Sequence, residues 1–197
     1  MNFNFDVLLT LTFTLFAVID IVGSVPMLIA YKEKLGGLSS SKATLISGAL
    51  MIIFFFIGEP FLAVLGVDVS SFAVAGSVVI FILGLEMVLG IEFFKPDADP
   101  KAGTLVPIAF PLIAGSGTLT TIMSLKATFP KGDKNQYLIL IAILINLVIV
   151  YVVLVSLNFI QRILGRAGLI AVRKFFGVIL LAIAVKIFTT NISAFGA

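Results

Sequence analysis

Two short segments combine proline, glycine and hydroxyl residues inside otherwise apolar runs. The first is residues 23–26 (Gly-Ser-Val-Pro), and the second is residues 115–121 (Gly-Ser-Gly-Thr-Leu-Thr-Thr), preceded by Pro111. Proline removes a backbone donor and glycine destabilises a helix, so each segment predicts a helix break. We expect the helix to restart at Pro26 after the first break and near Thr118 after the second. A helix that restarts in this way presents free N–H groups and partial positive charge. The predicted chemistry is therefore the binding of a carboxylate or another anion.

One acidic residue adjoins the first break. Asp20 lies at the carboxyl end of the preceding helical segment, where the backbone already carries negative charge, so this end suits a cation. A positive end that faces a negative end matches a zwitterion, and a small amino acid fits better than a sugar or a simple ion. The predicted substrate-binding residues are Asp20, Gly23, Ser24, Gly115, Ser116, Gly117, Thr118, Thr120 and Thr121.

The elements that carry these residues are transmembrane helices. A chain of 197 residues with 60% hydrophobic residues, 12% charged residues and a mean hydropathy of +1.24 cannot bury its apolar side chains in one soluble core. Residues 102–125 and 135–161 contain no charge, and each run exceeds the roughly 20 residues that a spanning helix needs. We expect an all-α membrane protein with six transmembrane helices, at about residues 7–31, 43–65, 69–91, 105–129, 137–160 and 170–192.

The longest connector divides the chain into two similar halves. Residues 93–103 carry two prolines and two aspartates, and an offset of 100 aligns residues 78–82 with 178–182. We expect two inverted three-helix repeats within one membrane domain, residues 1–98 and 99–197, with discontinuous first and fourth helices. Both breaks then lie near the bilayer midplane. Paired broken spans in inverted halves indicate a transporter binding site.

Simpler interpretations exist for the same residues. Pro26 and Pro111 can bend packed helices, with glycine and serine supplying small surfaces for helix association. Matched depth of the two breaks favours the binding site. Asp20 has three candidate roles, namely holding a substrate ammonium, carrying a coupled proton, or capping a helix. Glu59 and Lys186 share one depth, and we expect a structural ion pair between them or side chains that extend to the membrane surface.

Several function classes lack the residues they need. The chain has no Cys and no His, so it offers no disulfide, no thiolate or imidazole metal site, and no histidine base for a nucleophilic Ser116. Lys126, about 15 Å along the same helix, is a poor substitute base. The net charge of +3 comes from short loops and not from a basic patch, which argues against nucleic-acid binding. We expect no enzyme activity, catalytic residue, metal or cofactor.

These residues resemble the MarC family of bacterial inner-membrane proteins, which is related to the lysine-exporter family. The family pattern Asn/Asp-Pro-x-Gly-x-x-Pro is similar to residues 20–26, and Phe-Pro-Leu-x-x-Gly-Pro-Gly followed by Ile-Thr-Thr is similar to residues 110–121. The match covers essentially the whole chain. Two family prolines are replaced by Ile21 and Ser116, so the backbone path of the family at both breaks does not carry over from the resemblance. The resemblance implies inverted repeats with broken first and fourth helices, and proton-coupled transport of small neutral amino acids such as glycine and alanine.

The resulting hypothesis is a secondary transporter that works by alternating access in the bacterial inner membrane. Its expected partners are the lipid bilayer, a small zwitterionic amino acid and protons as the coupling ion, with a monomer and a homo-oligomer both open. The rival hypotheses are a small-solute channel and a membrane scaffold that does not transport.

Positive charge predicts the orientation of the chain. Nine basic residues fall on the side opposite the termini and three on the side of the termini, and basic residues accumulate in the cytoplasm. The nine are Lys32, Lys34, Lys42, Lys95, Lys101, Arg162, Arg166, Arg173 and Lys174, and the three are Lys126, Lys131 and Lys134. We therefore expect both termini to lie outside.

The orientation is testable because the chain has no Cys. We expect a cysteine in the Ala98→Cys variant to stay unlabelled by a membrane-impermeant thiol reagent in intact cells, and to react after the cells are opened. Labelling in intact cells would place this connector outside and reverse the orientation.

Overall fold

The computed structural model describes residues 4–34, 36–91, 104–127, 129–130, 133 and 135–192, and every regular element within these ranges is helical. The elements are α1 (Phe5–Ile19), α2 (Val25–Lys34), α3 (Ser40–Val64), α4 (Val69–Leu89), the π-type helix η1 (Thr104–Ile113), α6 (Ser116–Ala127) and α7 (Gln136–Ile192). The predicted all-α class is confirmed for this part of the chain. The expected linker at residues 93–103, and with it the boundary at residue 98, lies outside the described residues.

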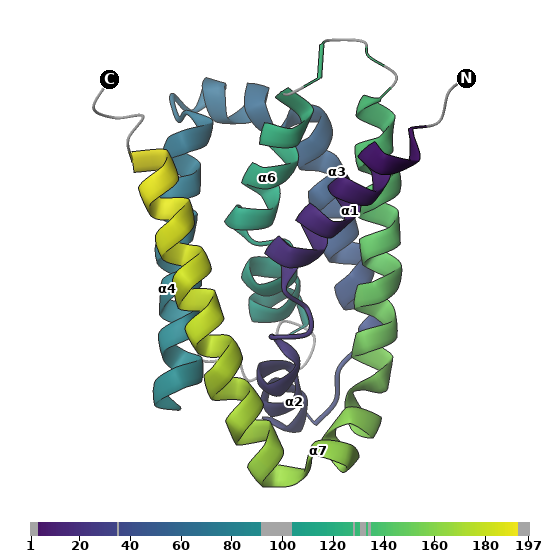
Figure 1. The fold of residues 1–197 in the computed structure, drawn as a ribbon, viewed down its shortest axis with the longest axis vertical. Helices are drawn as coiled ribbons and strands as arrows, with labels where there is room; N and C mark the ends of the chain where they lie inside the picture. The colour runs from purple at the N-terminus through teal and green to yellow at the C-terminus, as the bar shows by residue number, and fades with distance from the viewer. Residues whose placement is uncertain are drawn as a thin grey trace.

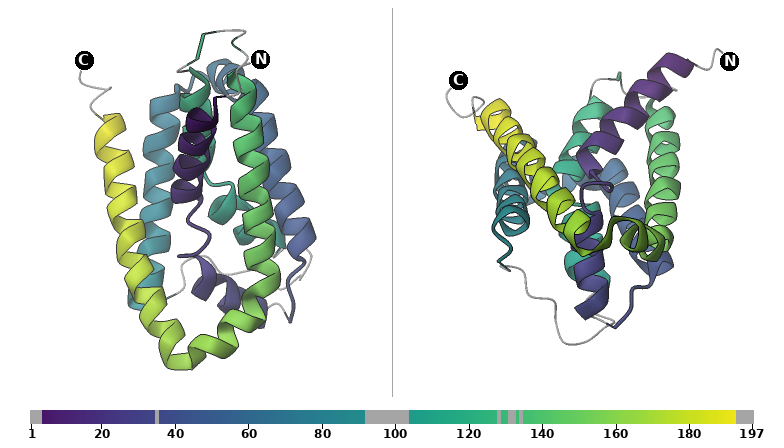
Figure 2. Two further views of the ribbon diagram at one scale, coloured as in Figure 1. Left: turned by 45° about the vertical axis from the view of Figure 1, so that its right-hand side comes forward. Right: turned by 60° about the horizontal axis from the view of Figure 1, so that its bottom comes forward.

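Four helical segments are long and apolar enough to cross a membrane. They are Ser40–Val64, Val69–Leu89, Gln136–Gly165 and Ala167–Ile192. The other two expected spans fall on pairs of shorter helices, α1 with α2 and η1 with α6. In each pair the helices follow one another along the long axis of the molecule (Figure 1). The start of α1 and the end of α7 lie at one end, while α2 and the bend in α7 lie at the other (Figures 1 and 2).

Polar side chains define where several helices begin. The Asn4 side chain accepts a hydrogen bond of 3.3 Å from the Val7 N–H at the start of α1. At the start of α4 the Asp68 carboxylate accepts from the Ser71 hydroxyl and, at 3.2 Å, from the Ser71 N–H. These bonds lower the pKa of Asp68, chiefly through the Ser71 hydroxyl, because they favour the ionised carboxylate.

The outer surface is apolar. Large side chains such as Phe13, Val64, Val148 and Phe159 are between 62% and 87% exposed, and they occur on helices all around the bundle. A soluble monomer rarely exposes contiguous apolar area of this extent, whereas lipid solvates it without cost. The exposed Phe and Val side chains therefore mark the lipid-facing surface.

A single glycine divides α7 into two spans. Gly165 has φ 59° and ψ −178°, a backbone conformation that is essentially restricted to glycine. The chain turns back there and places Ala167–Ile192 beside α4 (Figure 2). Sequence patterns predicted a connector at about residues 160–170. Instead, helical structure continues up to Gly165 and resumes at once.

The second part of α7 packs closely on α4 through two glycines. A Cβ atom added to Gly177 would lie 3.1 Å from the Gly84 carbonyl oxygen and 2.9 Å from Met87 Cβ, and one added to Gly84 would lie 3.1 Å from the Gly177 carbonyl oxygen. Small residues at such a contact allow two membrane helices to approach closely. The contact fixes α4 and the end of α7 as one pair.

The expected Glu59 to Lys186 ion pair is wrong. Both side chains are exposed, and no salt bridge joins them among the residues that the structure describes. Glu59 lies on α3 and Lys186 on the last part of α7, which lie on different sides of the bundle (Figure 1). Equal depth in the membrane placed the two residues at one level, and it carried no information on their position around the bundle axis.

The glycine contact yields a stability prediction. Gly177→Val should lower the free energy of unfolding by about 1–3 kcal/mol, because the added methyl groups meet Met87 and the Gly84 carbonyl. Ala182→Val, on an exposed face of the same helix, is the control and should change stability little. Thermal unfolding in detergent measures both, and equal melting temperatures for the two variants would contradict a close α4 to α7 contact.

Candidate functional site

The first helix break is organised by Asp20. This residue ends α1 in the left-handed conformation (φ 46°), and its N–H donates to the Phe16 carbonyl. Its side chain then bends back over the break, where Oδ1 accepts a hydrogen bond of 3.3 Å from the Gly23 N–H. The Asp20 carbonyl accepts a second bond, of 3.0 Å, from the Ser24 N–H. Asp20 therefore holds the backbone turn that separates α1 from α2.

The chain re-enters a helix directly after this turn. Ser24 is 1% exposed, and its carbonyl accepts the N–H of Leu28 at 2.9 Å, so α2 starts at Val25 with Pro26 in its first turn. Proline suits this place because the first N–H groups of a helix have no intrahelical partner. The predicted restart at Pro26 is confirmed to within one residue.

The second break separates η1 from α6. The Phe110–Pro111 peptide bond is cis, and the Ala114 N–H donates over five residues to the Ala109 carbonyl at 2.9 Å. The Thr118 hydroxyl bridges the break by donating to the Ile113 carbonyl at 3.1 Å. α6 begins at Ser116, two residues before the predicted restart.

The two breaks meet at a small buried cavity of about 20 Å³. Ser24 comes from the first break, and Gly115, Gly117 and Thr118 come from the second. The volume has room for one water molecule and not for an amino acid, so the structure shows the cavity in a closed state. Both breaks lie between the ends of the bundle, near its centre (Figure 1).

The remaining predicted residues lie around the cavity and do not line it. Gly23 faces the Asp20 carboxylate and Phe176 of α7, since an added Cβ would lie 2.5 Å from each. Ser116 lies against Gly76 of α4, where an added Cβ would overlap the Ser116 hydroxyl. These residues thus face the neighbouring helix α7 or α4.

Two threonines of α6 lie one turn beyond the cavity. The Thr121 hydroxyl donates to the Gly117 carbonyl at 2.8 Å. Thr120 is 6% exposed, and its hydroxyl has no hydrogen-bond partner. Of the nine predicted residues, the structure brings four to one cavity.

Sequence reasoning missed one wall of the cavity. Ile80 and Leu83 of α4 and Leu180 and Ile183 of α7 line the side formed by the α4 to α7 pair. These branched aliphatic residues resemble every other apolar residue in the two spans, so no sequence signal distinguishes them. Among the described residues that line the cavity, none is charged.

The charged group closest to the cavity along the chain is Asp20, which directly follows the lining residue Ile19. The Asp20 side chain is partly buried, and its Oδ2 atom is buried without a hydrogen-bond partner. A carboxylate in this environment loses hydration that the Gly23 N–H replaces only in part. It therefore retains capacity to accept a cationic or protonated partner.

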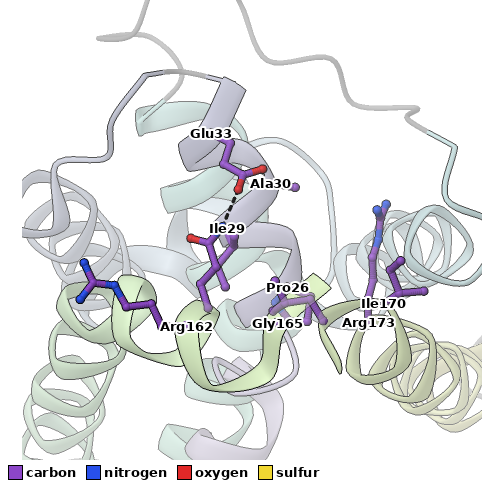
Figure 3. Close-up of a pocket in the computed structure, with 10 residues that line it drawn as sticks. Pro26, Ile29, Ala30, Glu33, Arg162, Gly165, Ile170 and Arg173 are labelled. Atoms are coloured by element: carbon purple, nitrogen blue, oxygen red, sulfur yellow. Dashed lines mark hydrogen bonds between the residues drawn. The ribbon is translucent and has the colours of Figure 1, made fainter. Parts of the chain in front are cut away.

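A larger pocket lies at the end of the molecule opposite the termini. Its volume is about 730 Å³, and it lies between α2 and the Gly165 bend, with Arg162 and Arg173 on opposite sides (Figure 3). Among its lining residues, the Gln161 side chain donates a hydrogen bond of 2.5 Å to the Glu33 carboxylate, marked by the dashed line at Glu33 (Figure 3). The pocket reaches Pro26, two residues from Ser24 of the central cavity.

A second pocket adjoins the cavity from the other side. It has a volume of about 310 Å³ and includes Lys186, Thr190 and Asn191 near the end of α7. Val18 and Ile183 line both this pocket and the central cavity, so these two side chains separate them. The central cavity is thus separated from this second pocket by two side chains.

Comparison with known proteins identifies the family. The model of the MarC family of integral membrane proteins matches residues 5–195. The chain belongs to the MarC family. The resemblance seen in the two break segments is therefore confirmed.

Relatives in the MarC family span nearly the same length. The UPF0056 membrane protein MJ1677 of Methanocaldococcus jannaschii is 31% identical over 193 residues, which cover 91% of this chain and 92% of the relative. The UPF0056 membrane protein PYRAB13050 of Pyrococcus abyssi is 29% identical, with 92% of each chain covered. The UPF0056 inner membrane protein YhgN of Escherichia coli is 28% identical over 150 residues, 75% of each chain. No solved structure matches the chain.

The geometry of Asp20 predicts the effect of two substitutions. Asparagine tolerates the left-handed conformation and keeps an acceptor for the Gly23 N–H, so Asp20→Asn should unfold within a few degrees of the unsubstituted protein. Asp20→Ala loses both features and should cost about 1–3 kcal/mol. Thermal unfolding is the measurement, with Asp6→Ala on the exposed first turn of α1 as the control. A loss in Asp20→Asn equal to that in Asp20→Ala would contradict the capping role.

Proposed function

We propose that this MarC family protein is a secondary transporter of small neutral amino acids, such as glycine and alanine, across the inner membrane. The observation that carries the proposal is the meeting of two helix breaks at one enclosed cavity near the centre of the bundle. Backbone that leaves helical structure at this depth is tolerated where it is buried in protein or lines a site. Two interruptions at one place are the arrangement by which transporters hold a substrate.

The breaks offer complementary charges to a zwitterion. The first turn of α6 brings Gly117 and Thr118 to the cavity, and the partial positive charge at the start of a helix favours a carboxylate. Asp20, at the carboxyl end of α1, provides the negative group for an ammonium. A neutral amino acid carries both charges, and its net charge of zero matches a cavity without charged lining residues.

The aliphatic wall favours a small side chain. Ile80, Leu83, Leu180 and Ile183 face the backbone breaks across the cavity, and the closed cavity has a volume of about 20 Å³. Binding of glycine or alanine then requires only a modest shift of the α4 to α7 pair, whereas a larger side chain would displace it further. This wall supports the assignment to small neutral amino acids.

The pockets on the two sides support alternating access. The 310 Å³ pocket would connect to the centre if Val18 and Ile183 moved, the 730 Å³ pocket lies toward the opposite end of the bundle, and a transporter must open the two sides one at a time. In the same proposal, six spans form two inverted repeats, residues 1–98 and 99–197, with both termini outside. Each half then begins with a broken span, α1 with α2 or η1 with α6.

Two other functions are consistent with family membership. A channel would need a continuous path, and the closed cavity between two pockets favours a carrier instead. A scaffold that transports nothing would not need two breaks around one cavity. Saturable exchange of substrate across the membrane separates a carrier from both alternatives.

The first experiment is a thermal-shift screen of the twenty amino acids on protein purified in detergent. A ligand that binds only the folded state raises the melting temperature by mass action, and we expect glycine and alanine to do so. Purified protein in liposomes preloaded with the same amino acid should then show saturable counterflow. Absence of both a shift and counterflow for all twenty would refute the proposed function.

Gly117→Val tests whether the cavity is the substrate site. A Cβ on Gly117 would lie 2.8 Å from Ile80 Cδ1 and 3.8 Å from Val18 Cγ1, so the larger side chain fills the cavity. We expect at least a tenfold loss of glycine affinity, equal to about 1.4 kcal/mol, in a protein that still folds. Ser124→Val, on an exposed face of α6, is the control and should bind normally. Normal affinity in folded Gly117→Val would remove α6 from the site.

A further inference from the structure

α3 contains a proline in its last third. The helix runs from Ser40 to Val64, and Pro60 interrupts its hydrogen bonds because proline has no N–H. The carbonyl of Phe56, four residues earlier, therefore lacks its helical donor, and the proline ring opens the turn around it. At 1.5 Å per residue this turn lies about 13 Å before the end of α3. No water supplies a donor at such a depth in lipid.

The side chain of Lys126 fills this opening. Its Nζ atom donates to the Phe55 carbonyl at 2.6 Å and lies 3.4 Å from the Phe56 carbonyl. The same atom lies 5.0 Å from the centre of the Phe55 ring, and that side chain is 4% exposed. Carbonyl oxygens and the face of an aromatic ring both attract a cation. All three contacts belong to one turn of α3.

Among the described residues, the Lys126 ammonium contacts two backbone carbonyls and one aromatic ring, and it contacts no carboxylate. Glu59, on the next turn of α3, is exposed and forms no salt bridge with Lys126. Lys126 itself lies in the last turn of α6, where the helix dipole favours positive charge. The turn of α3 thus has the composition of a cation site built from backbone carbonyls.

We propose that the turn of α3 opened by Pro60 is a binding site for a primary ammonium group, and that Lys126 occupies it. The ammonium gives the Phe56 carbonyl a donor, at 3.4 Å, in place of the N–H that Pro60 lacks. Its shorter bond to the Phe55 carbonyl fixes the last turn of α6 to α3. Gly58 supports the contact, since an added Cβ would lie 2.7 Å from the Met123 sulfur. Because Gly117 and Thr118 lie in the first turn of α6, Lys126 is a positioning residue for the helix that lines the central cavity.

The first test is a double-substitution cycle. Lys126→Met keeps most of the side-chain length and removes the charge and the donors, and it should lower the melting temperature by about 5 °C. Pro60→Ala restores an N–H for the Phe56 carbonyl. In that background we expect Lys126→Met to lower the melting temperature by less than half as much. If Lys126 only extends to the membrane surface, Lys126→Met should lower the melting temperature equally with Pro60 and with Pro60→Ala. That result would overturn the proposal.

The second test supplies the missing group from solution. Lys126→Ala removes three methylenes and the ammonium, which together correspond to the n-propylammonium ion. We expect n-propylammonium chloride to raise the melting temperature of Lys126→Ala above its value in tetramethylammonium chloride at equal concentration, and to have no such effect on the unsubstituted protein. Tetramethylammonium carries the charge without N–H donors. Equal effects of the two salts on Lys126→Ala would contradict a site for a primary ammonium.

A third measurement needs no substitution of Lys126. An amine-reactive reagent should modify Lys126 more slowly than the exposed Lys186 in the folded protein, with both rates read by mass spectrometry. In Pro60→Ala the rate at Lys126 should rise toward that of Lys186, because the carbonyls no longer hold the ammonium. Equal rates at Lys126 in the two proteins would overturn the proposal even if the Lys126 variants fail to fold.

Discussion

The structure depends on one constraint, that backbone N–H and C=O groups inside a bilayer must find partners within the protein. At three helix interruptions a specific side chain supplies such a partner. The Asp20 carboxylate accepts the Gly23 N–H, the Thr118 hydroxyl donates to the Ile113 carbonyl, and Lys126 donates to the opened turn of α3. Each interruption lowers the stability of the fold only as far as the replacement hydrogen bond is weaker than the helical hydrogen bond that was lost. Next to the first break, the Oδ2 atom of Asp20 keeps no hydrogen-bond partner.

The close pairing of α4 with the last part of α7 has a second role beside stability. Through Gly84 and Gly177 it forms one wall, which covers both breaks from the same side with aliphatic side chains. The opposite wall is made of backbone turns with free polar groups. The central cavity therefore has a polar face and an apolar face, which come from different spans.

Much of this organisation was predictable from residue chemistry. The all-helical class and the places of the two breaks follow from long uncharged runs and from clusters of proline and glycine, because these residue types constrain the backbone wherever they occur. The direction of a side chain around a helix was not predictable. Ser116 faces Gly76, Glu59 and Lys186 lie apart, and the wall residue Ile80 resembles its lipid-facing neighbours. Rotation about the helix axis is set by packing partners from distant spans, and a single sequence does not name them.

The bend at Gly165 joins the last two spans without an intervening loop. No spare length of chain lets the final span slide along its neighbour, and so a rotation at that one residue would swing the final span together with the α4 helix that is packed against it. The final span has 26 residues and is about 39 Å long, and a swing of roughly 10° displaces its far end by about 7 Å. Gly165 is thus placed to act as a hinge. A rotation of a few degrees at Gly165, beside Arg162 and Arg173, would displace the far end of the span by a distance comparable to the size of an atom.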